Sequence, residues 1–322
     1  MVKEPMPKKK ILILGASGFI GYNCLIHFAK NKNYIVSGTY NNNKPKNIKG
    51  VKLYKIDLTN IEKIKNIFKG VDILIQAAAT TSGAKDILSK PYMHVNDNAI
   101  MNSFVTKIAY DNQIKHVIIF SCTVMYKSSK YALKEDDFDP NDEMYDKYFG
   151  AGWMKVFVEK MSEFYSRFKV NKYTLIRHTN IYGPYDKFDL EKSHVFGATI
   201  TKVINNKKSI IDVWGDGKEK RNFLYVSDLM RFIDLVIKKQ KTYFEVFNVG
   251  SKDSISVADL VKQIILISKK NILIEYQKTK PTLKTDILID SSKAKKIVGW
   301  EPKVSLSQGI KKTILWYKKN LI

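Results

Sequence analysis

A glycine-rich turn near the start of the chain constrains its fold more than any other feature. Lys9–Leu14 has the pattern of a short buried strand, and Phe19–Asn31 has the pattern of a helix. The turn between them has the spacing G-x-x-G-x-x-G, and its candidate binding residues are Gly15, Ser17, Gly18, Phe19, Ile20 and Gly21. Glycines in a strand–turn–helix let the backbone approach a pyrophosphate, which the helix N-terminus then attracts. The sequence therefore predicts a dinucleotide-binding turn.

Strand-like and helix-like segments alternate over the following 150 residues or so. The predicted strands are residues 34–40, 51–56, 71–77, 116–121 and 173–177, and the predicted helices are residues 61–68, 97–112 and 152–168. This order favours an α/β fold of the Rossmann type, a doubly wound parallel sheet with right-handed crossovers. Residues 1–180 are expected to form the dinucleotide-binding domain, with residues 222–250 returning to it. Residues 181–322 are expected to form a smaller α/β substrate-binding region.

Composition excludes several other classes. Hydrophobic residues make up 44% of the 322 positions, which excludes a disordered chain. No apolar run approaches the roughly 18–20 residues of a membrane span, so no membrane partner is expected. The two cysteines, Cys24 and Cys122, cannot form a zinc cluster or a disulfide framework. We therefore expect no metal and a location in the reducing cytoplasm.

The net charge of +24 raises the possibility of a nucleic-acid partner. Only four of the 55 basic residues are arginines, and the lysines are spread over the whole chain. Dedicated nucleic-acid binders concentrate arginine or interleaved aromatic residues on one stripe, so the sequence favours no nucleic-acid partner. Scarcity makes each arginine informative, because such a position could require the planar guanidinium fork.

The choice between NAD and NADP depends on the end of the second strand. Asn41 to Asn43 and Lys44 follow Tyr40 there, with neither an acid nor an arginine. Asn41 can hydrogen-bond a ribose hydroxyl and Lys44 could meet a 2′-phosphate, so NAD is favoured and NADP stays open. Asp57 and Leu58 are candidate adenine contacts, although Asp57 could equally cap the next helix.

Motifs along nearly the whole chain carry a family resemblance. They are Gln76-Ala77-Ala78-Ala79, Ser121-Cys122-Thr123, Asn180 with Tyr182-Gly183-Pro184, Arg221 within Arg-Asn-Phe-Leu-Tyr-Val, and Gly299-Trp300-Glu301-Pro302. The chain thereby resembles the extended short-chain dehydrogenase/reductases, the NAD-dependent epimerase/dehydratase family, which act on nucleotide sugars. Segments 180–188, 193–195 and 213–215 are most similar to GDP-L-fucose synthases.

The resemblance implies roles for matching positions. It places Ala77, Ala78, Ala79, Asn96 and Lys155 at the cofactor, and Asn180, His194, Val195, Lys202, Trp214 and Arg221 at the nucleotide sugar. A guanidinium at position 221 suits a diphosphate, whereas the alternative is an ion pair with Asp216 or Glu219. Trp214 could instead belong to the core. His194 matches a general acid and could instead be structural.

The resemblance also exposes a departure from the family. Its members use a Tyr-x-x-x-Lys helix in which the tyrosine moves the proton, but here Ala151 stands four residues before Lys155. The pairs Tyr126/Lys130 and Tyr165/Lys169 are interpreted as coincidental. Tyr145 and Tyr148 precede the helix and could reach the site from the loop. The assisting serine position holds Cys122, beside Thr123, and the position of the epimerisation cysteine holds Val124.

The candidate catalytic residues are Thr123, Lys155, Cys122 and His194. The favoured activity is NAD-dependent oxidation of the C4 hydroxyl of a GDP-hexose or GDP-heptose, in the synthesis of bacterial surface-polysaccharide sugars. One alternative is an NADPH-dependent GDP-4-keto-sugar reductase or epimerase, and 3,5-epimerisation is doubtful without the cysteine. Another is a non-catalytic nucleotide-binding protein, which the missing tyrosine favours. Separately, Ala151 could be an engineered substitution that inactivates the enzyme. The resemblance further implies a homodimer built on helices 97–112 and 152–168.

Overall fold

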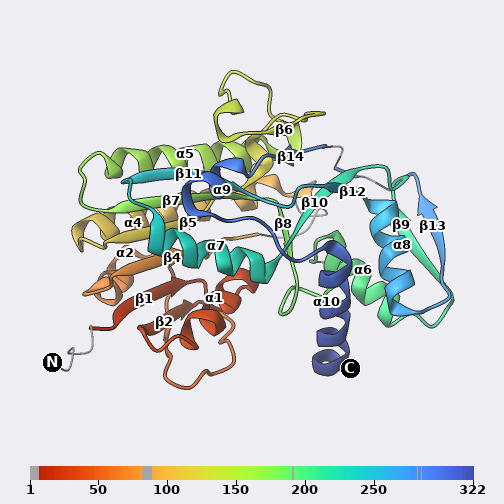
Figure 1. The fold of residues 1–322 in the computed structure, drawn as a ribbon, viewed down its shortest axis with the longest axis horizontal. Coiled ribbons are helices and arrows are strands. Elements are labelled where there is room, and N and C mark those ends of the chain that lie inside the picture. The colour runs from red at the N-terminus through yellow and green to blue at the C-terminus, as the bar shows by residue number, and fades with distance from the viewer. Residues whose placement is uncertain (1–6, 82–88, 191, 281, 284) are drawn as a thin grey trace.

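The computed structural model describes residues 7–81, 89–190, 192–280, 282–283 and 285–322 (Figure 1). Its largest element is a seven-stranded parallel sheet in the order β11-β7-β5-β4-β1-β2-β3. The strands are β1 (Lys9–Leu14), β2 (Tyr34–Tyr40), β3 (Lys52–Lys55), β4 (Ile73–Gln76), β5 (His116–Phe120), β7 (Lys172–His178) and β11 (Phe244–Val249). The predicted doubly wound sheet is confirmed, and the strand expected to return from beyond residue 222 is β11.

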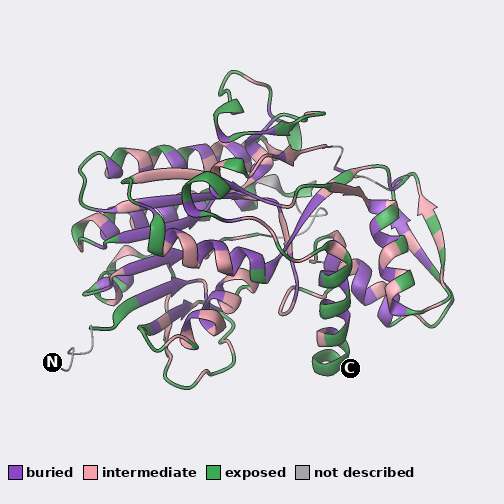
Figure 2. Ribbon diagram, viewed as in Figure 1, coloured by how far each residue is buried: buried purple, intermediate pink, exposed green. Residues whose placement is uncertain are grey.

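Helices cover both faces of this sheet because β1 is apolar on both sides. Ile11 and Ile13 face a core shared with α1 (Phe19–Ala29), α7 (Val226–Lys239) and α9 (Ser292–Val298). Leu12 and Leu14 face the opposite core, built with α4 (Asn96–Asp111) and α5 (Phe149–Ser166). The alternation is the two-residue period of a strand buried on both faces. Figure 2 shows the buried strands between these two helical layers.

A second region lies beyond the carboxyl ends of the strands (Figure 1). It holds a three-stranded sheet of β12 (Ser254–Ser256), β10 (Lys220–Tyr225) and β8 (Asn180–Tyr182), and a parallel pair of β9 (Ile210–Trp214) and β13 (Leu273–Gln277). Its core joins these strands to α6 (Val195–Ile204), α8 (Val257–Ser268) and α10 (Leu306–Leu321). A short parallel pair joins β6 (Ala132–Leu133), which follows β5 in the chain, to β14 (Leu288–Ile289), which precedes α9.

Several predicted boundaries shift in ways that matter for the site. The helix expected over residues 61–68 divides into α2 (Ile61–Ile64) and a 3₁₀ turn, Lys65–Phe68. Helix α5 begins at Phe149, three residues before the predicted start, so Tyr148 becomes its N-cap residue. Further 3₁₀ turns are Pro91–His94, Thr123–Met125, Glu135–Asp137 and Asp146–Tyr148. Within the described residues, no helix has the length and apolar character needed to cross a membrane.

Candidate active site

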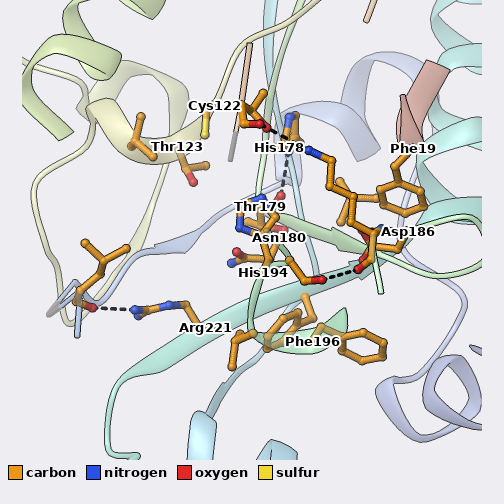
Figure 3. A pocket seen from close by; sticks show the side chains of 18 of the residues that line it. Phe19, Cys122, Thr123, His178, Thr179, Asn180, Asp186, His194, Phe196 and Arg221 are labelled. Carbon is orange, nitrogen blue, oxygen red and sulfur yellow. Dashed lines mark hydrogen bonds between the residues drawn. The ribbon is translucent and has the colours of Figure 1, made fainter. Parts of the chain in front are cut away.

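One cavity of about 810 Å³ lies where the two regions meet. The region around the large sheet contributes Gly18, Ala78, Cys122 and Lys155 to its lining, and the second region contributes Arg221. Figure 3 shows Cys122 and Thr123 on one side of this space and Arg221 across it. The carboxyl ends of parallel strands are where ligands bind in open α/β sheets, and this cavity occupies that position.

The glycine turn has the geometry that a pyrophosphate requires. Gly15 has a φ of +71°, and a Cβ there would lie 2.5 Å from the Cα of Ala78. A Cβ on Gly21 would lie 2.1 Å from the carbonyl oxygen of Gly15. Gly18 is the N-cap of α1 and supplies no side-chain cap, so the first amides of the helix are left to another acceptor. These features fit the diphosphate of a dinucleotide cofactor.

Half of the residues predicted at the cofactor line the cavity. They are Gly18, Phe19, Ile20, Ala77, Ala78, Ala79 and Lys155. Ser17 is exposed and borders a second, more open pocket with Tyr185. Asn96 is exposed and outside the lining, whereas Asn98 and Asn102 of the same helix belong to it. The Asn98 side chain accepts a 2.9 Å hydrogen bond from the amide of Thr80.

The adenosine end is the least defined part of the predicted site. Asn41 is exposed directly after β2, as the prediction requires, but its surroundings do not distinguish NAD from NADP. The Asp57 carboxylate accepts hydrogen bonds from the Thr59 hydroxyl (2.7 Å) and amide (2.9 Å), and these bonds lower its pKa. Asp57 therefore stabilises the turn before α2. The Leu58 side chain is buried in the core, so it does not line the adenosine end of the site.

Helix α5 carries the position where the family tyrosine is missing. Ala151 and Lys155 are one turn apart, and both line the cavity. Lys155 Nζ donates to the carbonyl oxygen of Phe120 at 2.8 Å. Burial lowers the pKa of Lys155, while nearby Cys122 and Glu159 oppose that shift. The cavity wall thus presents a methyl group where the resemblance places a phenol.

The two other tyrosine–lysine pairs lie elsewhere, as interpreted from the sequence. The Tyr126 hydroxyl is buried, donates to Asn248 Oδ1 at 2.9 Å, and accepts from Arg177 at 2.7 Å. Tyr165 packs on Tyr110 with ring centroids 5.4 Å apart, at the far end of α5. Neither tyrosine is part of the described cavity lining.

A buried ion pair holds the loop that carries the candidate catalytic residues. Arg177 Nη2 lies 2.7 Å from Glu159 Oε2, with both side chains almost completely buried. Glu159 Oε1 also accepts a 2.6 Å hydrogen bond from the Ser121 hydroxyl. Cys122 and Thr123 follow Ser121 directly and line the cavity. Arg177 thus uses its planar guanidinium in a buried ion pair. The sequence did not indicate that Glu159 would be its partner.

Two histidines and an aspartate face the same space (Figure 3). His178 Nδ1 lies 2.7 Å from the carbonyl oxygen of Thr179, and burial lowers its pKa to about 4. His194 is the N-cap residue of α6, and burial together with the charge of Lys187 lowers its pKa. His194 is therefore neutral near pH 7, which suits a hydrogen-bonding role better than delivery of a stored proton. Burial raises the pKa of Asp186 to about 7.

Tyr148 also enters the cavity, from the N-cap position of α5. Burial raises its pKa to about 12, and the nearby charge of Arg221 opposes the shift. The sequence could anticipate its proximity to the site but not its orientation. His178, Asp186 and Asn98 carried no signal that separated them from ordinary structural residues.

The residues predicted at the nucleotide sugar gather in the other half of the cavity. They are Asn180, His194, Val195, Lys202, Trp214 and Arg221. Trp214 is 37% exposed, so the alternative of a core tryptophan is wrong. Lys202 Nζ donates to the Asp212 carboxylate at 3.0 Å, and Asn180 Nδ2 donates to the Asn222 carbonyl at 3.1 Å.

Arg221 forms no ion pair with Asp216 or Glu219 in the part of the chain that the structure describes. Its guanidinium instead donates to the backbone carbonyls of Leu283 (2.6 Å) and Thr285 (2.8 Å). Neutral carbonyl acceptors leave the positive charge of Arg221 uncompensated at the cavity wall. Such a charge is suited to an anionic ligand group.

Comparisons with known proteins agree with this geometry. GDP-L-colitose synthase of Yersinia pseudotuberculosis is 28% identical over 314 residues, which cover 96% of this chain and 97% of the relative. UDP-glucuronate 4-epimerase of Thermodesulfobacterium geofontis is 27% identical over 328 residues, covering 96% of each. A crystal structure of UDP-glucose 4-epimerase with UDP-glucose from Thermotoga maritima matches with a TM-score of 0.83 and 25% identity, covering 97% of this chain and 100% of that one.

A family model also matches most of the two regions that form the cavity. It covers residues 11–250, which include the glycine turn, the Ser121–Thr123 loop, Lys155, Asn180 and Arg221. The names of these relatives refer to a GDP-linked and a UDP-linked sugar, so both relatives are enzymes of nucleotide sugars. The chain belongs to the NAD dependent epimerase/dehydratase family.

Proposed function

We propose that this protein oxidises the C4 hydroxyl of a GDP-hexose or GDP-heptose, with NAD as the cofactor. The observation that supports it is one continuous cavity with a dinucleotide turn and Lys155 at one end and Asn180, Trp214 and Arg221 at the other. A cofactor and a nucleotide sugar can therefore share one enclosed space. Proximity of this kind contributes much of the rate in hydride transfer, because both reactants are already oriented.

In this proposal, different residues bind the cofactor, orient the reacting sugar oxygen and bind the diphosphate of the nucleotide sugar. The glycine turn holds the cofactor diphosphate, and Lys155 binds the nicotinamide ribose. When bound, the nicotinamide supplies the acceptor for the hydride. Thr123 and Cys122 orient the reacting sugar oxygen, with Thr123 the stronger hydrogen-bond donor because a neutral thiol donates weakly. His194 hydrogen-bonds the sugar, and Asn180 and Arg221 bind the diphosphate.

The far end of the cavity supports guanine as the base. Trp214 and Glu219 both line it, and Trp214 offers an exposed indole for stacking. Glu219 Oε2 is buried without a hydrogen-bond partner among the described residues. A buried carboxylate oxygen without a donor is costly, so a donor from the ligand would stabilise it. Guanine carries two adjacent donors, N1–H and the 2-amino group, whereas uracil offers a single N–H between two carbonyls.

A binding experiment tests the nucleotide part of the proposal. Calorimetric titration with GDP, IDP, UDP and ADP should give the tightest binding for GDP, with IDP weaker because it lacks the 2-amino group. The Glu219→Gln variant should lose the preference of GDP over UDP. Asp216→Asn is the matched control, because Asp216 is an exposed carboxylate in the same loop. Equal binding of GDP and UDP by the unmodified protein would contradict the choice of guanine.

A second candidate reaction is reduction of a GDP-4-keto sugar with NADPH. The observation that favours it is the similarity to GDP-L-colitose synthase over 96% of this chain. Epimerisation is disfavoured, because Val124 supplies no acid or base at the cavity wall. Consumption of a GDP-4-keto-6-deoxy sugar with NADPH, without oxidation of any GDP-hexose with NAD, would favour this reaction. Either reaction would serve the synthesis of surface-polysaccharide sugars, and an intact surface glycan after deletion of the gene would count against that role.

We also propose that a second copy of this chain covers the outer face of α4 and α5. Large apolar side chains on these helices are exposed: Ile100, Phe149, Phe157 and Phe164, with Phe168 just beyond α5. Such a patch on two packed helices favours self-association as a four-helix bundle. Light scattering should give twice the chain mass, and Phe157→Glu with Phe164→Glu should give a monomer. A monomeric unmodified protein would refute the dimer.

A further inference from the structure

Tyr148 lies on the same helical face as the two residues that define the missing-tyrosine position. Its backbone is in the right-handed helical region (φ −103°, ψ −3°), so the periodicity of α5 extends back to it. Seven residues separate Tyr148 from Lys155, which is within about 20° of two full turns. Ala151 lies between them, and all three side chains line the cavity. Tyr148 is thus one turn before the position that lacks a phenol.

The chain has 18 tyrosines, but Tyr148 is the only one in the cavity lining that the structure describes. Tyr126 is committed to Arg177 and Asn248, and Tyr165 lies among aromatic rings at the other end of α5. Neither of the tyrosine–lysine pairs found in the sequence can therefore supply a phenol to the cavity in place of Tyr148.

The groups around Tyr148 belong to several elements. Its hydroxyl interacts electrostatically with Cys122 after β5, Arg221 on β10 and Tyr145 before α5, and Thr285 hydrogen-bonds it. Cys122 in turn interacts with Lys155. The phenol is consequently near the thiol at the serine position and near the cation proposed for the diphosphate.

We propose that Tyr148 exchanges the proton of the reacting sugar hydroxyl, in place of the side chain that Ala151 lacks. This inference rests on the proposed function. In the oxidising direction the sugar O–H bond breaks and its proton passes to the Tyr148 phenolate oxygen. The C–H bond breaks at the same carbon, its electron pair leaves as hydride to an oxidised nicotinamide, and a ketone forms. In reduction Tyr148 donates the proton to the ketone oxygen. Arg221, whose charge already opposes the raised pKa of Tyr148, supplies the positive charge that stabilises the phenolate.

The Tyr148→Phe variant tests this role, and Tyr145→Phe is its matched control. The two rings pack with centroids 5.6 Å apart, but Tyr145 is absent from the cavity lining. Loss of a positioned proton-transfer group should lower kcat by about 10²–10⁴-fold, with KM for the nucleotide sugar changed little. The rise of the rate with pH should also disappear in Tyr148→Phe. Tyr145→Phe should keep both the rate and the pH profile.

Two further measurements separate this role from a structural one. Placing tyrosine at position 151 in the Tyr148→Phe background (Ala151→Tyr/Tyr148→Phe) should restore turnover, because the phenol would again face Lys155. Ultraviolet titration of tyrosinate, which needs no turnover, should show one high-pKa tyrosine fewer in Tyr148→Phe. Addition of a GDP-sugar should lower the pKa of that tyrosine in the unmodified protein and leave the Tyr148→Phe titration unchanged.

The outcomes distinguish failure of this inference from failure of the proposed function. Turnover of Tyr148→Phe close to that of Tyr145→Phe would overturn the inference while leaving a working enzyme. A large loss of turnover in His178→Gln, without a loss in Tyr148→Phe, would overturn it as well, and would assign the proton transfer to His178, a further titratable group that interacts with Lys155. Absence of nucleotide-sugar binding and turnover in the unmodified protein would instead refute the proposed function.

Discussion

Replacement of Glu159 by alanine is the sharpest test of what holds the Ser121–Thr123 loop in place. Glu159 and Arg177 are 7% and 6% exposed, and their closest atoms are 2.7 Å apart. Removing one partner of a buried pair costs about 3–5 kcal/mol, because the remaining charge stays buried without compensation. This cost includes the loss of the hydrogen bond that the Ser121 hydroxyl donates to Glu159. For a chain of this length the loss corresponds to a decrease in Tm of about 4–7 °C.

Thermal and urea unfolding followed by circular dichroism would measure this effect. Glu163→Ala is the matched control, since Glu163 lies one turn later on α5 and pairs with Lys160 and Arg167 at a partly exposed site. That variant should lose less than about 1 kcal/mol. The double replacement Glu159→Leu/Arg177→Met should recover much of the stability lost by Glu159→Ala. Equal losses for Glu159→Ala and Glu163→Ala would refute the reasoning.

Three further predictions follow from individual positions. Gly15→Ala should abolish cofactor binding in fluorescence titrations, because its φ is +71° and its Cβ would lie 2.5 Å from Ala78; normal binding would contradict the turn's role. Trp214→Ala should weaken GDP binding by about 5–150-fold in calorimetry, the range for loss of one stacked base, and an unchanged affinity would place the base elsewhere. Burial lowers the pKa of His116 to about 3, below its unfolded value near 6.5, so its stabilising contribution is complete above pH 6.5 and is lost as pH falls toward 3. His116→Gln should therefore flatten the acid side of the stability curve by up to about 1.4 kcal/mol per pH unit in urea titrations, and an unchanged slope would argue against a buried neutral histidine.

The sheet and its glycine turn could be predicted because their signals are local. Each central strand is a short apolar run, and the turn requires glycine at positions that a Cβ would block, as at Gly15 and Gly21. The return of Phe244–Val249 to the sheet could also be predicted, because the segment has the apolar pattern of a strand. Residues such as Asn180 and Trp214, which line the cavity, could be identified through the family resemblance because each lies within a contiguous motif.

Features that depend on helix phase or on long-range pairing could not be predicted. Tyr148 enters the cavity because α5 begins at Phe149, and a boundary shift of three residues decides which side chains face inward. The family resemblance placed Asn96 in the candidate site, whereas the phase of α4 turns Asn98 toward the cavity. Glu159 and Arg177 meet only once α5 packs on β7, and His178 faces the cavity only because it is the last residue of that strand.

The central claim is that this cavity joins a nicotinamide cofactor to a nucleotide sugar for hydride transfer. The most direct test is the absorbance of reduced nicotinamide after GDP-linked hexoses and heptoses are added to the protein with NAD. We expect a rise in absorbance that depends on both ligands and is lost in Tyr148→Phe but retained in Tyr145→Phe. No rise with any GDP-linked sugar, under conditions in which calorimetry shows both ligands bound, would contradict the proposed oxidation.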